Sequence, residues 1–313
     1  MPTPFNSEKI IIHIIKNQEF SSFLVGFDLK DDGTKEYRLK PLVKKLTHVI
    51  QEFAFGFHEN THTENTETLR KLTEAANTIY KIDAFHRVKN IYLAEDKAID
   101  DNVEDKYLRR GEFGELILHL LLRDFYNTIP LLSKIYFKDS VGHAVHGFDS
   151  VHIHEESKTL WLGESKIYTD GKKGVKELIN DIKEHFKTDY LNSEFLLISK
   201  KLKHLDNIPE KDFWLNVLTD TRTLKDKLNI INIPLLCTFQ SDLFTNYNDE
   251  NEPAFLKEYN AEMEELWNFF NQINDHPLKA NLNIILILFP VQNKKELVKA
   301  LHTKLSILQR LGE

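Results

Sequence analysis

The stretch that decides the fold runs from Val145 to Tyr168 and reads V-H-G-F-D-S-V-H-I-H-E-E-S-K-T-L-W-L-G-E-S-K-I-Y. Two segments in it, 148–154 and 159–168, are rich in β-branched and aromatic residues and flank the polar group E-E-S-K. Such segments on either side of a polar turn are typical of a β-hairpin. We therefore expect two adjacent strands here, and the rest of the chain to pack around them.

Acidic side chains occupy unexpected places in this predicted hairpin. Asp149 opens the first strand, and Glu164 and Lys166 lie two residues apart in the second, on one face of it. Phosphodiester hydrolysis needs a nucleophilic water and neutralisation of charge on phosphorus, which divalent ions supply. Hard oxygen ligands select Mg²⁺ or Mn²⁺, so Asp149, Glu164 and the backbone carbonyl of Ser165 are candidate metal ligands. Lys166 is a candidate to orient or deprotonate the attacking water, or to stabilise the developing negative charge.

A further acid comes from the helix that we expect over 107–126. The sequence G-E-F-G-E near its start places Glu112 and Glu115 three residues apart, on neighbouring positions of the helix surface. The two glycines permit close backbone approach, so we add Glu115 to the catalytic and metal-binding set. For Glu112, a contact to substrate and a simple interaction with the helix dipole explain the residue equally well.

Charge and cysteine content narrow the setting. The chain has 313 residues, a formal net charge of −7 and a single cysteine, Cys237. Without a global basic field, attraction to nucleic acid has to come from a local basic patch or from another subunit. One cysteine allows no intramolecular disulfide, and the beginning of the chain does not resemble a cleavable signal, so we expect a cytoplasmic protein. The apolar runs are too short to cross a bilayer, and we expect no membrane association.

The hydrophobic pattern along the chain predicts alternating strands and helices. An acidic run at 94–105 suggests a boundary between an N-terminal α+β portion, 1–100, and a core, 101–313. Asp170 to Lys173 reads as a turn. We expect strands at 10–15, 20–29, 132–137, 231–239 and 282–289, and helices at 39–57, 67–85, 175–187, 190–202, 211–228, 252–273 and 294–311.

The order of these motifs resembles the PD-(D/E)xK nuclease superfamily. Glu115 lies in the first helix, Asp149 at the start of one strand and Glu164-x-Lys166 in the next, although Phe148 stands where the superfamily's name has proline. The resemblance implies an α/β, restriction-endonuclease-like core with a mixed central sheet flanked by helices. More closely, R-R-G-E-F-G-E-L-I-L-H-L-L-L, H-G-F-D-S-V-H-I and L-W-L-G-E-S-K-I-Y resemble the HamA family, the nuclease component of the Hachiman anti-phage defence system.

This resemblance implies a Mg²⁺-dependent deoxyribonuclease that acts with a helicase partner, HamB, on DNA, with no small-molecule cofactor. Lys172 and Lys173 follow the active strand and His146 precedes Asp149, so these three are candidate substrate contacts, although a solvated helix face explains the lysines as well. The histidines near the site lack the H-E-x-x-H spacing of a zinc hydrolase. Two alternatives stay open: a catalytically silent nuclease-fold subunit of a nucleic-acid-processing complex, and a buried ion-pair network around Lys166.

Overall fold

The computed structural model describes residues 3–56, 67–79, 111–132, 147–205, 208–219 and 223–311. In this part of the chain, a central sheet contains seven strands in the order β1-β2-β9-β8-β7-β6-β5. The strands of the central sheet are β1 (Ile11–Lys16), β2 (Phe20–Val25), β5 (Ile129–Leu132), β6 (Ser150–His154), β7 (Thr159–Tyr168), β8 (Ile231–Gln240) and β9 (Asn283–Val291). A separate hairpin is formed by β3 (Phe27–Leu29) and β4 (Lys35–Tyr37).

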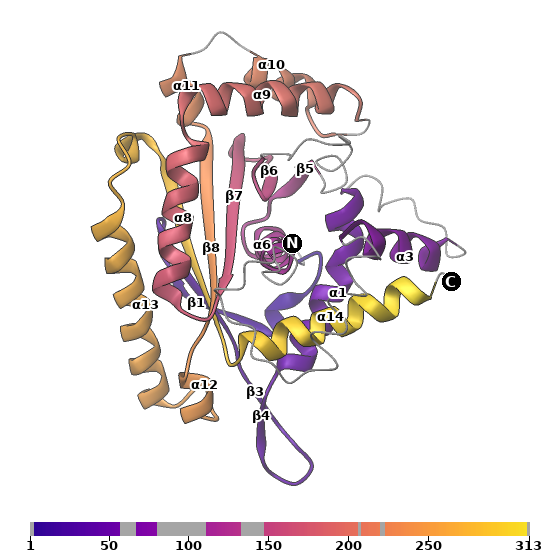
Figure 1. The fold of residues 1–313 in the computed structure, drawn as a ribbon, viewed down its shortest axis with the longest axis vertical. Helices are drawn as coiled ribbons and strands as arrows, with labels where there is room; N and C mark the ends of the chain where they lie inside the picture. Colours follow the sequence, from indigo (N-terminus) through magenta and orange to yellow (C-terminus); the bar gives the residue numbers. More distant parts are fainter. Residues whose placement is uncertain are drawn as a thin grey trace.

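Helices cover both faces of the central sheet. Figure 1 shows α8 and α13 on one side of it and α1, α6 and α14 on the other. The α-helices of the described chain are α1 (Leu39–Phe55), α3 (Thr68–Ile79), α6 (Gly111–Phe125), α8 (Gly171–His185), α9 (Thr188–Lys203), α10 (Lys211–Thr219), α11 (Leu224–Leu228), α12 (Leu243–Asn246), α13 (Pro253–Ile273) and α14 (Lys294–Arg310). The short 3₁₀ helices are η1 (Ser7–Lys9) and η2 (Lys279–Asn281).

The sheet is mixed, as the resemblance to the PD-(D/E)xK superfamily implied. Strands β2, β9, β8 and β7 run parallel, whereas the pairs β1–β2, β5–β6 and β6–β7 are antiparallel. Strands β8 and β9 are buried along almost their whole length, which explains their nearly continuous apolar sequence. The predicted hairpin around E-E-S-K is confirmed, because β6 pairs with β7 from His154–Thr159 to Ser150–Gly163.

Helix α1 illustrates how local sequence sets an element. Its apolar residues recur at spacings of three and four, and Leu42, Leu46 and Phe53 are all buried. The helix ends at Gly56, whose φ of 88° is a conformation that residues with a side chain rarely adopt. The predicted helix 39–57 is therefore confirmed.

Several boundaries differ from the prediction: the predicted strand 20–29 is divided into β2 and β3, and the predicted helix 211–228 corresponds to the separate helices α10 and α11. The segment that reads as a turn at Asp170 begins α8, because the Asp170 side chain accepts hydrogen bonds from the backbone N–H groups of Lys172 and Lys173 and caps the helix. Strand β5 lies earlier than predicted, and residues 133–137 are outside the described part. Strand β9 continues through Pro290 to Val291, because its pairing with β2 stops at Leu288 and no partner there needs the missing N–H.

The N-terminal portion shares the sheet and core of the rest of the chain. Strand β2 pairs with β9, and α1 packs against α6 and α14. One continuous hydrophobic cluster extends from Ile11 to Leu308. The boundary predicted near residue 100 lies outside the described residues. Within the described ranges, no helix is both long and apolar enough to span a membrane.

Candidate functional site

Strand β7 extends beyond the end of β6, and the predicted site begins where the pairing of the two strands ends. The pairing of the two strands stops at Ser150 and Gly163, so Glu164 and the residues after it extend beyond β6. Asp149 lies beside this part of β7, which β6 does not pair with. Its Oδ2 accepts hydrogen bonds from the Ser165 backbone N–H at 2.8 Å and from the Ser165 hydroxyl at 2.9 Å. The carboxylate of Asp149 is thereby fixed against the edge of β7.

Helix α6 brings Glu115 to the same edge. A Cβ atom added at Gly114 would lie 3.1 Å from Ser165 Oγ, so the glycine permits the first turn of α6 to pack tightly on β7. Glu115 follows directly and is buried, with 6% of its surface exposed. Glu112 lies at the start of the same helix and is only half-buried.

Helix α8 approaches the site from the opposite face of the sheet. Glu164 and Lys166 share the face of β7 that this helix covers, and each meets an α8 side chain. The Lys166 ammonium lies 2.5 Å from Asp181 Oδ2. His185 Nδ1 lies 2.6 Å from Glu164 Oε1. The helix after β7 thus contributes two side chains to the site in addition to the predicted ones.

The carboxylates disfavour one another's charge. Burial raises the pKa of Glu164 well above its usual value, and the charges of Asp149 and Asp181 raise it further. Lys166 acts in the opposite direction, and Glu115 adds a smaller contribution that again raises the pKa. Four carboxylates are therefore close enough to interact through their charges, and a cation among them would relieve this repulsion.

Lys166 remains a cation in these surroundings. Burial disfavours its charge, but Asp181, Asp149 and Glu164 outweigh that effect and hold the pKa of Lys166 above its usual value. For Asp181, burial raises the pKa, and the charge and hydrogen bond of Lys166 partly offset the increase. An ammonium that stays protonated can stabilise negative charge, but it is a poor base for activating water.

Aromatic rings hold His185 in place. The Tyr190 ring stacks on its imidazole, with centroids 4.7 Å apart and an interplanar angle of 14°. The Phe148 ring approaches the imidazole edge-on at 5.6 Å. Phe148 immediately precedes Asp149, so the residue that departs from the superfamily's proline packs against the side chain that contacts Glu164.

The predicted basic residues do not join this cluster. Lys172 forms an ion pair with Glu265 of α13 at 2.5 Å. Lys172 and Lys173 lie in the first turn of α8, nine and eight residues before Asp181, which is about 12–14 Å along the helix axis. His146 lies outside the described residues.

Sequence analysis missed Asp181 and His185. They lie four residues apart, next to the apolar positions Leu178 and Ile182 that identified the helix. A carboxylate and an imidazole at i and i+4 beside an apolar stripe are a usable signal, because such positions face the sheet rather than water. The sequence alone does not show that α8 packs against β7, and this packing is what brings Asp181 and His185 to the site.

The donor set matches a hard divalent cation in chemistry. Carboxylate oxygens are the ligands that Mg²⁺ and Mn²⁺ prefer, and the charges here repel one another in the absence of a cation. Among the described residues, however, no three histidine, cysteine, aspartate or glutamate side chains lie in a ligating arrangement. The ammonium of Lys166 provides the positive charge within the cluster instead.

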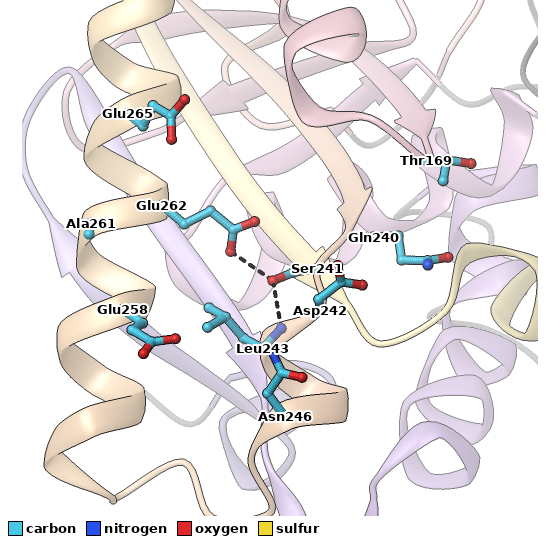
Figure 2. A pocket seen from close by; sticks show the side chains of 10 residues that line it. All are labelled: Thr169, Gln240, Ser241, Asp242, Leu243, Asn246, Glu258, Ala261, Glu262 and Glu265. Atoms are coloured by element: carbon cyan, nitrogen blue, oxygen red, sulfur yellow. Dashed lines mark hydrogen bonds between the residues drawn. The ribbon is translucent and has the colours of Figure 1, made fainter.

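A separate cavity of about 540 Å³ opens at the carboxyl ends of β7 and β8. Figure 2 shows that its lining comes from the ends of these strands and from α12 and α13, with the Ser241 hydroxyl donating to Glu262 at 2.7 Å. Neither the predicted site residues nor Asp181 and His185 line it. The cavity and the carboxylate cluster are different features of the molecule.

Fold and family are consistent with each other. A mixed central sheet flanked by helices, with acids on α6, on β7 and immediately before β6, beside the lysine of β7, defines an α/β protein with a nuclease-like fold. The model of the HamA family matches residues 3–305, nearly the whole chain, so the chain belongs to the HamA family and is an anti-phage defence protein. No curated protein matches the chain.

Proposed function

We propose that the chain is a metal-dependent deoxyribonuclease and the effector of its defence system. One observation supports this proposal most strongly: Asp149, Glu164 and Lys166 lie together where β7 extends beyond β6, and Ser165 orients Asp149. Glu115 joins them from α6. Carboxylates beside a lysine suit the metal-dependent hydrolysis of phosphodiesters. Zinc chemistry typically uses thiolates or a histidine triad instead.

Each side chain has a role in this proposal. Asp149, Glu164 and Glu115 would hold Mg²⁺ or Mn²⁺, with the Ser165 carbonyl as a further oxygen ligand. When bound, the metal would supply an activated water and neutralise charge on the phosphate. Lys166, which pairs with Asp181, would stabilise the negative charge that develops on phosphorus.

Helix α8 keeps the two central residues in position. Asp181 anchors the Lys166 ammonium, and His185 anchors the Glu164 carboxyl. Outer contacts of this kind orient ligands and tune their basicity.

A helicase partner would solve the problem of substrate capture. The chain has a net charge of −7, which repels DNA at long range. HamB-like helicase activity would bring DNA to the site and restrict cleavage to invading or aberrant molecules. This part of the proposal depends on family membership and on charge.

The test is a cleavage assay on the purified chain with its helicase partner, Mg²⁺ and linear double-stranded DNA. Wild type is expected to degrade the DNA, and Glu164→Gln and Lys166→Ala are expected to lose the activity while they keep the wild-type circular dichroism spectrum and melting temperature. Cleavage that survives both substitutions would refute the site. A folded wild-type complex that never cleaves would favour the silent-subunit alternative.

A further inference from the structure

A basic cavity lies along helix α1, which packs against α6. It has a volume of about 490 Å³ and no acidic side chain in its lining. Its walls are formed by Ile10, Lys40, Pro41, Lys44, Lys45 and His48. In a chain with seven excess negative charges, this is a local concentration of basic side chains.

Three of these side chains form one stripe on the helix. Lys40, Lys44 and His48 follow one another at intervals of four residues and are exposed, so they line one face over about 12 Å. The opposite face of α1 is buried, with Leu42 and Leu46 in the core. Packing therefore explains the apolar face, but it does not explain why the outer stripe is basic.

The stripe is unfavourable for the helix itself. Like charges four residues apart destabilise a helix by about 0.2–0.5 kcal/mol for each pair. Cations in the first turns also oppose the helix dipole, and the first turn of α1 contains no acid to offset them. Among the described residues, neither Lys40 nor Lys44 forms an ion pair.

The other two basic side chains have different roles. Lys45 donates a hydrogen bond to the Phe5 carbonyl and lies near Glu8, so its charge is partly used within the fold. For His48, burial and then the charges of Lys45 and Lys44 lower the pKa, which leaves a neutral ring able to donate one N–H at neutral pH. Lys40 and Lys44 are thus the two lysines of the cavity whose charges have no ion-pair partner among the described residues.

We propose that this basic cavity binds the phosphate backbone of the DNA on which the nuclease centre acts. The inference builds on the proposed function, and it specifies where the chain itself contacts DNA. A polyanion is the ligand that fits two lysines and a neutral imidazole spaced over about 12 Å, because consecutive phosphates can contact consecutive helical turns.

The cavity and the catalytic site are joined by two packed helices. Glu52 of α1, two turns beyond Lys44, contacts His119 of α6 at 3.0 Å between Oε1 and Nε2. Glu115 lies one turn before His119 on α6. The path is roughly 12 Å along α1 and 6 Å along α6, and the spacing between the two packed helix axes adds about 8–10 Å, so the total is less than one helical turn of DNA, about 34 Å.

The test is fluorescence anisotropy with a labelled 20-base-pair duplex and the full chain, without divalent ions so that no cleavage occurs, at a series of salt concentrations. The Lys40→Ala/Lys44→Ala double variant is expected to bind several-fold more weakly at low salt. Its slope of log affinity against log salt should be smaller by about 1.8, because two phosphate contacts are lost. The matched control is Lys257→Ala/Lys304→Ala, which removes two exposed helical charges elsewhere and should leave the slope unchanged.

Three results would overturn the proposal. These are no DNA binding by the wild-type chain, equal loss of slope in the double variant and the control, and competition by polyglutamate as effective as competition by unlabelled DNA. The last result would assign the surface to an acidic protein partner. The readout is independent of catalysis, so a chain that binds DNA through this cavity but never cleaves it would refute the proposed function alone.

Discussion

Asp181 determines the charge and the position of Lys166. It lies 2.5 Å from the ammonium and is the strongest of the three carboxylates that keep Lys166 protonated. If the ammonium stabilises the transition state, Asp181→Asn should lower kcat by about 10- to 100-fold with little change in KM, because substrate binding does not use this contact. Steady-state cleavage kinetics measure both constants.

The control for Asp181→Asn is Asn180→Ala, an exposed neighbour on the same helix that should keep wild-type kinetics. An unchanged kcat in Asp181→Asn would show that Lys166 needs no anchor. A drop in the melting temperature large enough to account for the loss of activity would reduce Asp181 to a structural role.

His185 acts on Glu164 through one ring nitrogen. Since Nδ1 makes the 2.6 Å contact, His185→Ala should weaken Mn²⁺ binding by about 10- to 100-fold, the usual effect of losing an outer-shell partner. His185→Asn places an amide nitrogen near the position of Nδ1 and should restore most of the affinity. Calorimetric titration of both variants distinguishes this role from packing, because a purely aromatic contribution against Tyr190 would be lost equally in both.

Glu194 makes stability depend on pH. Burial raises its pKa to about 7, against a usual 4.5 in the unfolded chain. The folded state therefore holds the proton more tightly, so its contribution to stability is complete below pH 4.5 and is lost as pH rises to 7. Over that range wild type should lose roughly 1–3 kcal/mol more than Glu194→Gln. Urea unfolding at several pH values gives the difference, and parallel pH profiles would contradict this assignment.

At the scale of elements, a buried polar network joins α1 to α6. Arg123 Nε lies 2.6 Å from Glu52 Oε1, and His119 contacts the same carboxylate. Arg123→Ala would leave Glu52 buried with less compensation and should cost about 3–5 kcal/mol of unfolding free energy. The pair Glu52→Gln/Arg123→Met should recover part of that loss. A single-variant cost below about 1 kcal/mol, measured by urea unfolding, would contradict this view of the network.

The elements also show what could be predicted from sequence. Helix α1 and the β6–β7 hairpin follow from local periodicity and were predicted with nearly correct bounds. The start of α8 was missed because its first turn contains Gly171 and two lysines, and only the Asp170 cap reveals it as a helix. The continuation of β9 through Pro290 depends on where β2 stops pairing, which is long-range information.

The same distinction between local and long-range information applies to the candidate site. Glu164 and Lys166 could be placed together because strand alternation puts them on one face of β7, and Asp149 could be placed near them because it lies at the start of the same predicted hairpin. Asp181 and His185 could not be placed, because their part in the site arises only when α8 packs on β7. The catalytic roles of all of these residues stay predictions.

At the scale of the whole molecule, acidic and basic side chains are concentrated in different places. The carboxylate cluster lies against β7, and the basic cavity lies along α1. The N-terminal strands and α1 belong to the same sheet and core as the catalytic elements, so the two regions are held at a fixed spacing. If both proposals hold, the chain contacts DNA at one place and cleaves it at another.

The central claim is that the carboxylate cluster binds a divalent cation, and calorimetric titration of the purified chain with Mn²⁺ tests it without a partner or substrate. Wild type should bind Mn²⁺ with measurable heat, and Asp149→Asn, which keeps the shape of the side chain and its contact to Ser165, should lose at least 10-fold in affinity. Absence of binding in wild type, or equal affinity in Asp149→Asn, would contradict the account.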